Sequence, residues 1–431
     1  MSTLRRAIGL PSATALVVGT IIGSSIFVQA SEITALVPSA WAVVLAWAAA
    51  GVLTLIGALV CAELASAYPK TGGVYVFLKE IYAPSLGFLW GWAMLWTMHS
   101  GILAAIATVF ARYAGYFVPM GDTATRLVAI GAIFVLSGIN YFGVRLGGGV
   151  QSAFTLVKVA AVVAIIAIGW ALSDPSAAVV AAPAAPIGAG NFLLAVGAGL
   201  FAFGGWHMVT YTAEETVDPT RTIPRSLLIG VVVVTLCYIG LNAVYLRVLS
   251  IDKVIASSRV AADTFDVLVG AGGASIISAL VMFSAFGALN GIVLVGPRVY
   301  YQMAQDGLWF KWAGHLHPRF QTPGRAILLQ GVWSSVLVLT GTYRALFTRV
   351  IYTEWIFFAL LALGVVLLRR RPGYQPAWRM PLVPIAPLVF VIASAAIVLN
   401  QIRADLTESA IGLLIVASGL PAYYFWNRKA S

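Results

Sequence analysis

The first long apolar segment of this chain contains the stretch VGTIIGSSIF, residues Val18 to Phe27. Glycine costs about 1 kcal/mol relative to alanine inside a helix, and hydroxyl side chains favour caps and turns. A helix in lipid must nevertheless satisfy all its backbone polar groups. Such weak helix formers in the middle of the segment therefore indicate an interrupted helix.

The composition places this segment in a membrane. Of the 431 residues, 61% are hydrophobic and only 10% are charged, too few to cover the surface of a soluble domain. The first segment is long and lacks a small-residue cleavage site, so no cleavable signal is expected. The sequence predicts an all-α polytopic membrane protein with no soluble domain. Most of the apolar segments reach the roughly 20 residues that cross a bilayer, and we predict twelve: 12–36, 41–62, 86–111, 127–143, 150–172, 189–206, 227–246, 274–297, 326–342, 350–368, 382–399 and 410–426.

The basic residues that give the net charge of +11 are distributed as the predicted topology requires. With both termini placed in the cytoplasm, most of the 26 basic residues fall in the inner loops, as the positive-inside rule requires. A nucleic-acid partner is therefore not expected, and we expect a multi-pass protein of the cytoplasmic (inner) membrane. Cys61 and Cys237 lie in or at the end of spans, which excludes an extracellular disulfide framework.

A second interrupted helix indicates an internal duplication. The sixth span contains Phe201-Ala202-Phe203-Gly204-Gly205-Trp206, and glycine-broken segments at corresponding positions of two halves mark transporter binding sites. Because each half has five helices, the halves would insert with opposite topology. We predict one transmembrane domain with repeats over about 8–172 and 187–371, followed by two extra helices over about 382–427.

Two unwound helices suit a zwitterionic ligand. Free N–H groups at the start of a half-helix attract a carboxylate, and free carbonyls attract an ammonium group. The alternative is that these glycines only allow close packing of helices.

Five motifs along the chain, taken together and in this order, resemble those of one known family. They are VGTIIGSSIF, GGVYVFLKEIY, FAFGGWHMVTYTAEETVDPTRTIPRSL, FSAFGALNGIVLVGPRVYYQMAQDG and SGLPAYYF. Together they resemble the amino acid–polyamine–organocation (APC) superfamily, and most closely a prokaryotic version of its L-type amino-acid transporter branch. The resemblance covers nearly the whole chain. It implies a LeuT-type inverted repeat of five plus five helices and amino-acid transport by alternating access, often as an exchanger.

The resemblance also implies a substrate site at the two breaks. It places the substrate carboxylate on Gly23, Ser24 and Ser25. It places the substrate amine on the carbonyls of Ile21, Phe201 and Gly204, with Phe201 as a gate over the substrate. Ala202 lies in the same part of the second break.

Three departures from the family refine these expectations. Ser25 replaces a usual glycine, which favours a small substrate. Residues 113–126 contain no cysteine, so no disulfide-linked heavy chain is expected. Glu354, before Trp355, stands where transporters of bulky substrates carry a neutral amide.

Lys158 is the basic residue that falls well inside a span. An intramembrane charge costs at least about 2.5–3.5 kcal/mol and is a functional candidate by default. In similar family members a lysine here faces the broken part of the first helix, where sodium-coupled relatives bind an ion. Lys158 is therefore expected to replace sodium or to act as a protonation switch, and the alternative is a lysine that snorkels to an interface.

Glu354, His99 and His207 are further titratable candidates for a pocket or a proton relay. The alternatives are core histidines and an interfacial glutamate. Metal-spaced His/Cys clusters and the HExxH and GxxxxGK[ST] motifs do not occur, so neither a metal nor a cofactor is expected.

The sequence therefore predicts a secondary active transporter of small neutral L-amino acids, and not an enzyme. It would be independent of sodium and would work as an exchanger or a proton-coupled symporter. The alternatives are an amine, polyamine or cationic amino-acid transporter of the same fold, a channel, or a membrane-embedded enzyme.

Overall fold

The structure is a computed structural model that describes residues 6–23, 25–173, 187–257, 259–270, 272–340 and 343–430. These residues are almost entirely helical, and the one β-bridge among them joins Ile8 to Thr216. The helices are, in chain order, α1 (Leu10–Ile21), α2 (Ser25–Leu36), α3 (Ala40–Ala67), α4 (Val74–Ile81), α5 (Pro84–Ala93), η1 (Met94–Met98), α6 (His99–Ala114), α7 (Asp122–Tyr141), α8 (Val144–Leu172), α9 (Ala189–Ala202), η3 (Trp206–Glu215), α10 (Pro219–Val248), α11 (Ile251–Ala256), α12 (Val260–Val269), α13 (Gly273–Val295), α14 (Pro297–Gln305), η4 (Lys311–Gly314), α15 (Gly324–Thr340), α16 (Tyr343–Leu368), α17 (Ile385–Ala404), α18 (Leu406–Ala417) and α19 (Gly419–Ala430).

The apolar helices confirm a polytopic membrane protein. Within the described residues, nine helical segments are long and apolar enough to cross a membrane, and the bent pair α1 and α2 makes up to ten. The helices Gly324–Thr340 and Tyr352–Leu368 are also apolar, but each has only 17 residues and is too short to count as a full membrane span by itself. Each of the twelve predicted spans thus overlaps one or more of these helices, whereas the count of twelve spans and the five-plus-five repeat remain predictions.

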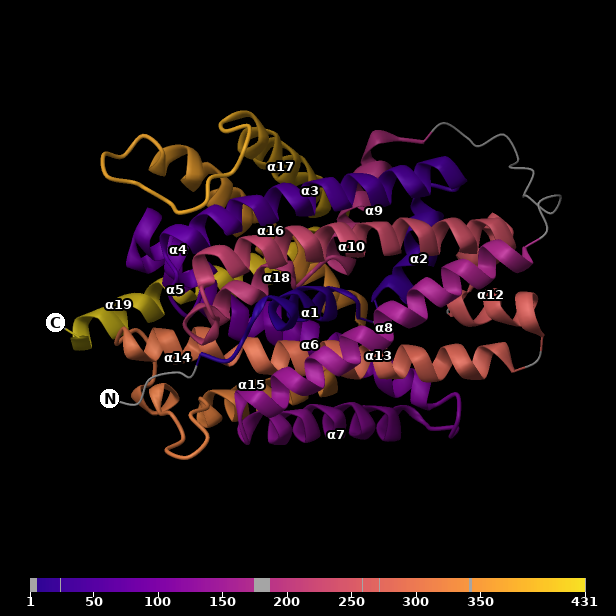
Figure 1. Cartoon of the computed structure of the whole chain (residues 1–431), viewed down its shortest axis with the longest axis horizontal. Helices are drawn as coiled ribbons and strands as arrows, with labels where there is room; N and C mark the ends of the chain where they lie inside the picture. The colour runs from indigo at the N-terminus through magenta and orange to yellow at the C-terminus, as the bar shows by residue number, and fades with distance from the viewer. Residues whose placement is uncertain are drawn as a thin grey trace.

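The helices form one bundle with α1 near its middle (Figure 1). Helix α1 packs against α8, α10 and α13, while α7 and α17 lie at opposite edges of the view. The segment that leads into α1 and the last helix, α19, lie towards the same end of the molecule.

Burial separates a central group of helices from peripheral ones. In the most apolar 18-residue stretch of Pro84–Ala114, 83% of the residues are buried, whereas in those of Ile385–Ala404 and Leu406–Trp426 only 28% and 17% are. Large apolar side chains of the peripheral spans are exposed, such as Ile392 and Leu414. In a membrane such side chains contact lipid, so the last two spans lie outside the core that holds the broken helices.

Candidate functional site

The first break separates α1 from α2. The two helices are bent by 44° relative to each other. The N–H of Ile22 donates to the Val18 carbonyl at 2.8 Å, but the N–H of Gly23 donates to Ile21 at 2.8 Å. In a continuous helix the N–H of Gly23 would donate to Gly19. The break therefore leaves the carbonyls of Gly19 and of the residues after it in need of other donors.

Lys158 supplies two of these donors. Its Nζ donates to the carbonyl of Gly19 at 2.8 Å and to that of Ile22 at 2.7 Å. The side chain comes from α8 and is 3% exposed. Ser284 of α13 adds a hydroxyl that donates to Gly23 at 3.1 Å. An ammonium group thus occupies the carbonyl end of the break, and it is fixed by charge-assisted hydrogen bonds.

The second break separates α9 from η3. The N–H of Gly204 donates to the Phe201 carbonyl at 2.9 Å, and Gly205 has a φ of +102°. Only glycine adopts such a φ readily, and a Cβ at Gly205 would lie 3.1 Å from the carbonyl oxygen of Thr20. The Thr20 hydroxyl, which lies 2.7 Å from the carbonyl oxygen of Leu16, is also 3.2 Å from that of Gly205. The two breaks are therefore in direct contact.

Tyr238 of α10 also joins the two breaks. Its hydroxyl lies 2.9 Å from the carbonyl oxygen of Ile21 and 3.0 Å from that of Ala202, so its one hydrogen is shared between the two acceptors. The ring is 1% exposed and contacts Trp47 edge-on. Sequence reasoning missed Tyr238 and Ser284, because single polar groups in apolar spans give no signal of the partner that they contact.

Replacing Tyr238 with phenylalanine tests this contact. The substitution leaves the Ile21 and Ala202 carbonyls without this donor in a buried place, and we expect it to lower the free energy of unfolding by about 1–3 kcal/mol. Thermal unfolding of the purified protein measures the effect, with Tyr424→Phe at an exposed position as the control. Equal unfolding temperatures for the two variants would contradict the bridging role.

The predicted amine-binding carbonyls already have partners. Ile21 accepts from the N–H of Gly23 and from Tyr238, and Phe201 accepts from the N–H of Gly204. A carbonyl oxygen has two lone pairs, so both of those of Ile21 are already engaged, and a substrate amine would have to replace one of the two donors there. The Phe201 side chain is 6% exposed and packs in the core.

On the carboxylate side, Gly23 packs closely against α13. A Cβ at Gly23 would lie 3.2 Å from that of Ala288. Ser25 is the first residue of α2 and is 6% exposed. Ser24 lies outside the described residues. The start of α2 thus presents buried N–H groups next to the break.

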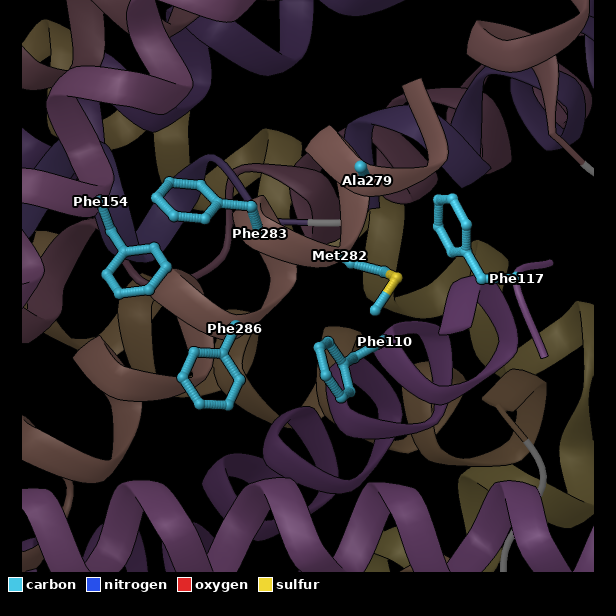
Figure 2. Close-up of a pocket in the computed structure, with 7 residues that line it drawn as sticks. All are labelled: Phe110, Phe117, Phe154, Ala279, Met282, Phe283 and Phe286. Atoms are coloured by element: carbon cyan, nitrogen blue, oxygen red, sulfur yellow. The ribbon is translucent and has the colours of Figure 1, made fainter. Parts of the chain in front are cut away.

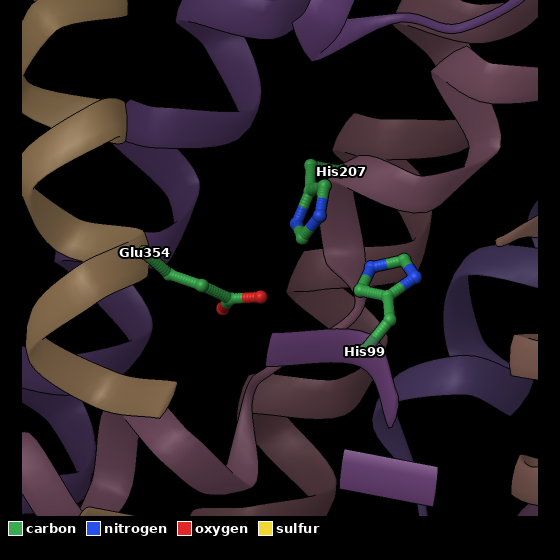
Figure 3. Close-up of side chains that lie close together, drawn as sticks. All are labelled: His99, His207 and Glu354. Carbon is green, nitrogen blue, oxygen red and sulfur yellow. The ribbon is translucent and has the colours of Figure 1, made fainter. Parts of the chain in front are cut away.

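His99, His207 and Glu354 lie together although they are far apart in the sequence (Figure 3). They come from α6, η3 and α16, and one ligand atom from each lies within 4.8 Å of the others. All three side chains are buried. His207 is two residues beyond Gly205, so this cluster borders the second break.

A buried ion pair closes the far end of η3. The guanidinium of Arg298, on α14, donates from Nε and from a terminal nitrogen to the two oxygens of Glu215, both at 3.1 Å. The exposed fractions of the two side chains are 0% and 1%. The Glu215 carbonyl also accepts from the N–H groups of Ala7 and Ile8, at 2.8 and 3.0 Å. The segment before α1 is thereby joined to the end of η3.

A second polar contact joins α4 to α14 near this end. Asp306 accepts hydrogen bonds from the Tyr75 hydroxyl and from Lys79 Nζ, both at 2.6 Å. Burial, and after it the neighbouring Asp306 carboxylate, raise the pKa of Tyr75 above its usual value. Tyr75 therefore stays protonated and acts as a donor at neutral pH.

An apolar pocket lies between α6, α8 and α13 (Figure 2). Its volume is about 430 Å³. Its lining consists of Phe110, Phe117, Phe154, Ala279, Met282, Phe283 and Phe286. These side chains carry no hydrogen-bonding group and no charge, and so nothing that binds a carboxylate, which makes the breaks the better candidates for the site of a zwitterion.

The bundle with two touching helix breaks defines a transporter-like membrane protein, and comparison with known proteins specifies the class. Residues 8–420 match the family model described as amino acid permease. The chain belongs to this family, which places it in the APC superfamily, and it is a transporter and not an enzyme.

Curated relatives support this membership along the whole chain. The serine/threonine exchanger SteT of Bacillus subtilis (strain 168) is 32% identical, over 99% of this chain and 98% of SteT. The human b(0,+)-type amino acid transporter 1 is 31% identical, over 100% of this chain and 91% of its own length. The human large neutral amino acids transporter small subunit 2 is 29% identical, over 99% of this chain and 82% of its own length.

Proposed function

We propose that this protein is a secondary active transporter of small neutral L-amino acids that works by alternating access as an exchanger or a proton-coupled symporter. The observation that carries the proposal is the direct contact between two unwound helices, Thr20 with Gly205, beside the buried start of α2. Membership of the amino acid permeases supports it. The related serine/threonine exchanger supports a small substrate and exchange.

The substrate backbone would bind to the protein backbone. The N–H groups at the start of α2 and the Ser24 and Ser25 hydroxyls would hold the carboxylate, where the helix dipole favours negative charge. The carbonyls of Ile21, Phe201 and Gly204 would accept from the amine, which at Ile21 would take the place of the Tyr238 hydroxyl. Binding would thus use backbone groups at the two breaks.

Sodium independence would follow from Lys158. Its ammonium donates to two carbonyls of the first break, at 2.8 and 2.7 Å, as a bound cation would contact them. The position of a coupling ion is then filled by a covalently attached charge. His99, His207 and Glu354 are the candidates for a proton relay in the symporter variant of this proposal.

The proposal includes a topology. Repeats over about 8–172 and 187–371 would form the LeuT-type core, and α17 to α19 the two additional spans. Both termini would face the cytoplasm, in line with the basic inner loops. No heavy chain linked by a disulfide is included, because residues 113–126 contain no cysteine.

A transporter of amines or cationic amino acids is the second candidate. The observation that favours it is the buried Glu354 carboxylate near the second break. A carboxylate in this place would attract a positively charged side chain. The two candidates predict different substrates from one panel.

Counterflow into proteoliposomes tests the proposal. Vesicles loaded with one unlabelled amino acid at a time should accumulate the same labelled amino acid when its side chain is small and neutral. Accumulation should persist when choline replaces sodium. A sodium requirement would contradict the role of Lys158, and accumulation of only cationic substrates would favour the second candidate. A pH gradient distinguishes exchange from proton-coupled uptake.

Replacing Ser25 with glycine is expected to widen the range of substrates. The substitution removes a hydroxymethyl group at the start of α2, and a group of this size changes discrimination by about 10- to 200-fold. Uptake of large neutral amino acids should therefore rise at least about tenfold relative to the small ones. Ser31→Gly on the same helix controls for the cost of a helix glycine. An unchanged substrate range would contradict the position of Ser25 in the site.

A further inference from the structure

Three strong metal ligands converge at the cluster of His99, His207 and Glu354. Each comes from a different helix, and Figure 3 shows the carboxylate of Glu354 directed towards the two imidazole rings. The three ligand atoms lie within 4.8 Å of one another. By plane geometry, a point between them is then at most about 2.8 Å from each atom, which is hydrogen-bond distance. A single small ligand at this point would reach all three side chains.

The cluster lacks internal hydrogen bonds. Within the described part of the chain, both ring nitrogens of His99, both of His207 and Oε1 of Glu354 have no hydrogen-bond partner. The three side chains are 0%, 0% and 3% exposed, so bulk water does not compensate. Buried polar atoms are nearly always paired, and a group of unpaired ones indicates a missing ion or water.

The surroundings make an unpaired carboxylate costly. The ring of His207 packs against the rings of Trp90, Trp206 and Phe358, at centroid distances of 4.8 to 5.7 Å. Among the described residues no cation lies within ion-pair distance of Glu354, and the ammonium of Lys158 is held at the first break. A buried carboxyl group in such surroundings either acquires a positive partner or takes up a proton and becomes neutral.

We propose that His99, His207 and Glu354 bind one divalent transition-metal ion, of which Zn²⁺ is the probe. Two imidazoles and one carboxylate form a donor set typical of zinc and related ions. Zinc–ligand bonds of about 2.0–2.2 Å require each donor to move inward by less than about 1 Å from the distances above. The remaining coordination position would take a water molecule.

This site departs from the expectation drawn from the sequence. The spacing of histidines and cysteines along the chain predicts no metal ligands, because His99, His207 and Glu354 are separated by more than a hundred residues each. Only the packing of α6, η3 and α16 brings them together. A binding site made by tertiary packing carries no local motif.

Metal titration of the purified chain tests the site. After treatment with a chelator, wild-type protein should bind one Zn²⁺ per chain by calorimetry and elemental analysis, with a higher unfolding temperature. His207→Ala and Glu354→Gln should each weaken binding at least about 100-fold. The control is His315→Ala, which removes an exposed histidine outside the cluster and should bind as wild type does.

A second readout uses unmodified protein, so it does not depend on the folding of a variant. Wild-type protein loaded with Co²⁺ should show visible d–d bands without the sulfur-to-metal charge-transfer band that a cysteine ligand would add. The proposal is overturned if the wild type binds no Zn²⁺ or Co²⁺, as a bridging water in the cluster would predict. It is also overturned if binding is lost in His315→Ala and kept in Glu354→Gln.

The ion has a consequence for transport, which rests on the proposed function. Alternating access would separate elements that the ion holds together, so Zn²⁺ should slow exchange and a chelator should restore it. If Zn²⁺ binds but exchange is not slower, the ion does not hold these elements together during transport. Metal-free protein that transports no amino acid would instead contradict the proposed function, so the two failures are distinguishable.

Discussion

Lys158→Met is expected to abolish transport while the protein still folds as a bundle. The variant keeps most of the apolar stem but removes the ammonium that donates to Gly19 and Ile22. Charge-assisted hydrogen bonds contribute about 1.5–3 kcal/mol each, so losing both should lower the exchange rate by at least about 100-fold. Exchange in proteoliposomes at equal protein content measures the effect.

The control for this variant is Lys253→Met, which removes an exposed lysine from α11 and should exchange at the wild-type rate. Size-exclusion profiles of both variants report on folding. Lys158→Ala adds a sharper test, because it opens a space where the ammonium lay. If Lys158 replaces a coupling ion, sodium should restore part of the binding in this variant. Wild-type exchange in Lys158→Met would contradict the account of the first break.

Arg298→Ala is expected to destabilise the end of the bundle where η3 meets α14. The variant leaves the Glu215 carboxylate buried without its bidentate partner. Breaking a buried ion pair from one side costs about 3–5 kcal/mol. The expected result is a lower unfolding temperature together with loss of exchange, because the N-terminal segment is held to the same residue.

Arg221→Ala is the matched control. Arg221 Nε and Asp218 Oδ2 are 3.9 Å apart in an exposed ion pair, and such pairs contribute little to stability. The double variant Glu215→Gln with Arg298→Met removes both charges and should recover stability relative to Arg298→Ala alone. An unfolding temperature of Arg298→Ala equal to that of Arg221→Ala would show that the buried pair does not stabilise this end.

The sequence predicted the breaks because their signal is local. Gly23 and Gly204 stand out within apolar spans, and a lone lysine at membrane depth is conspicuous for the same reason. The Lys158 ammonium donates to two carbonyls of the first break, and its role in transport stays a prediction. Backbone conformation and intramembrane charge are properties that a short stretch of sequence can carry.

The partners across the bundle could not be predicted in this way. Tyr238, Ser284 and Arg298 are ordinary residues in their own segments, and only packing shows which carbonyl or carboxylate each contacts. The same holds for the convergence of His99, His207 and Glu354. Contacts between distant segments depend on helix orientation, which the hydropathy pattern does not determine.

The proposed function requires the two breaks to bind the charged amino and carboxylate groups of the substrate. Calorimetric titration of the amino acid that gives the strongest counterflow, compared with its amide and its N-acetyl form, measures this requirement. We predict that each blocked form binds at least about 100-fold more weakly, corresponding to about 2.7 kcal/mol. Equal affinity for the free amino acid and either blocked form would contradict the claim.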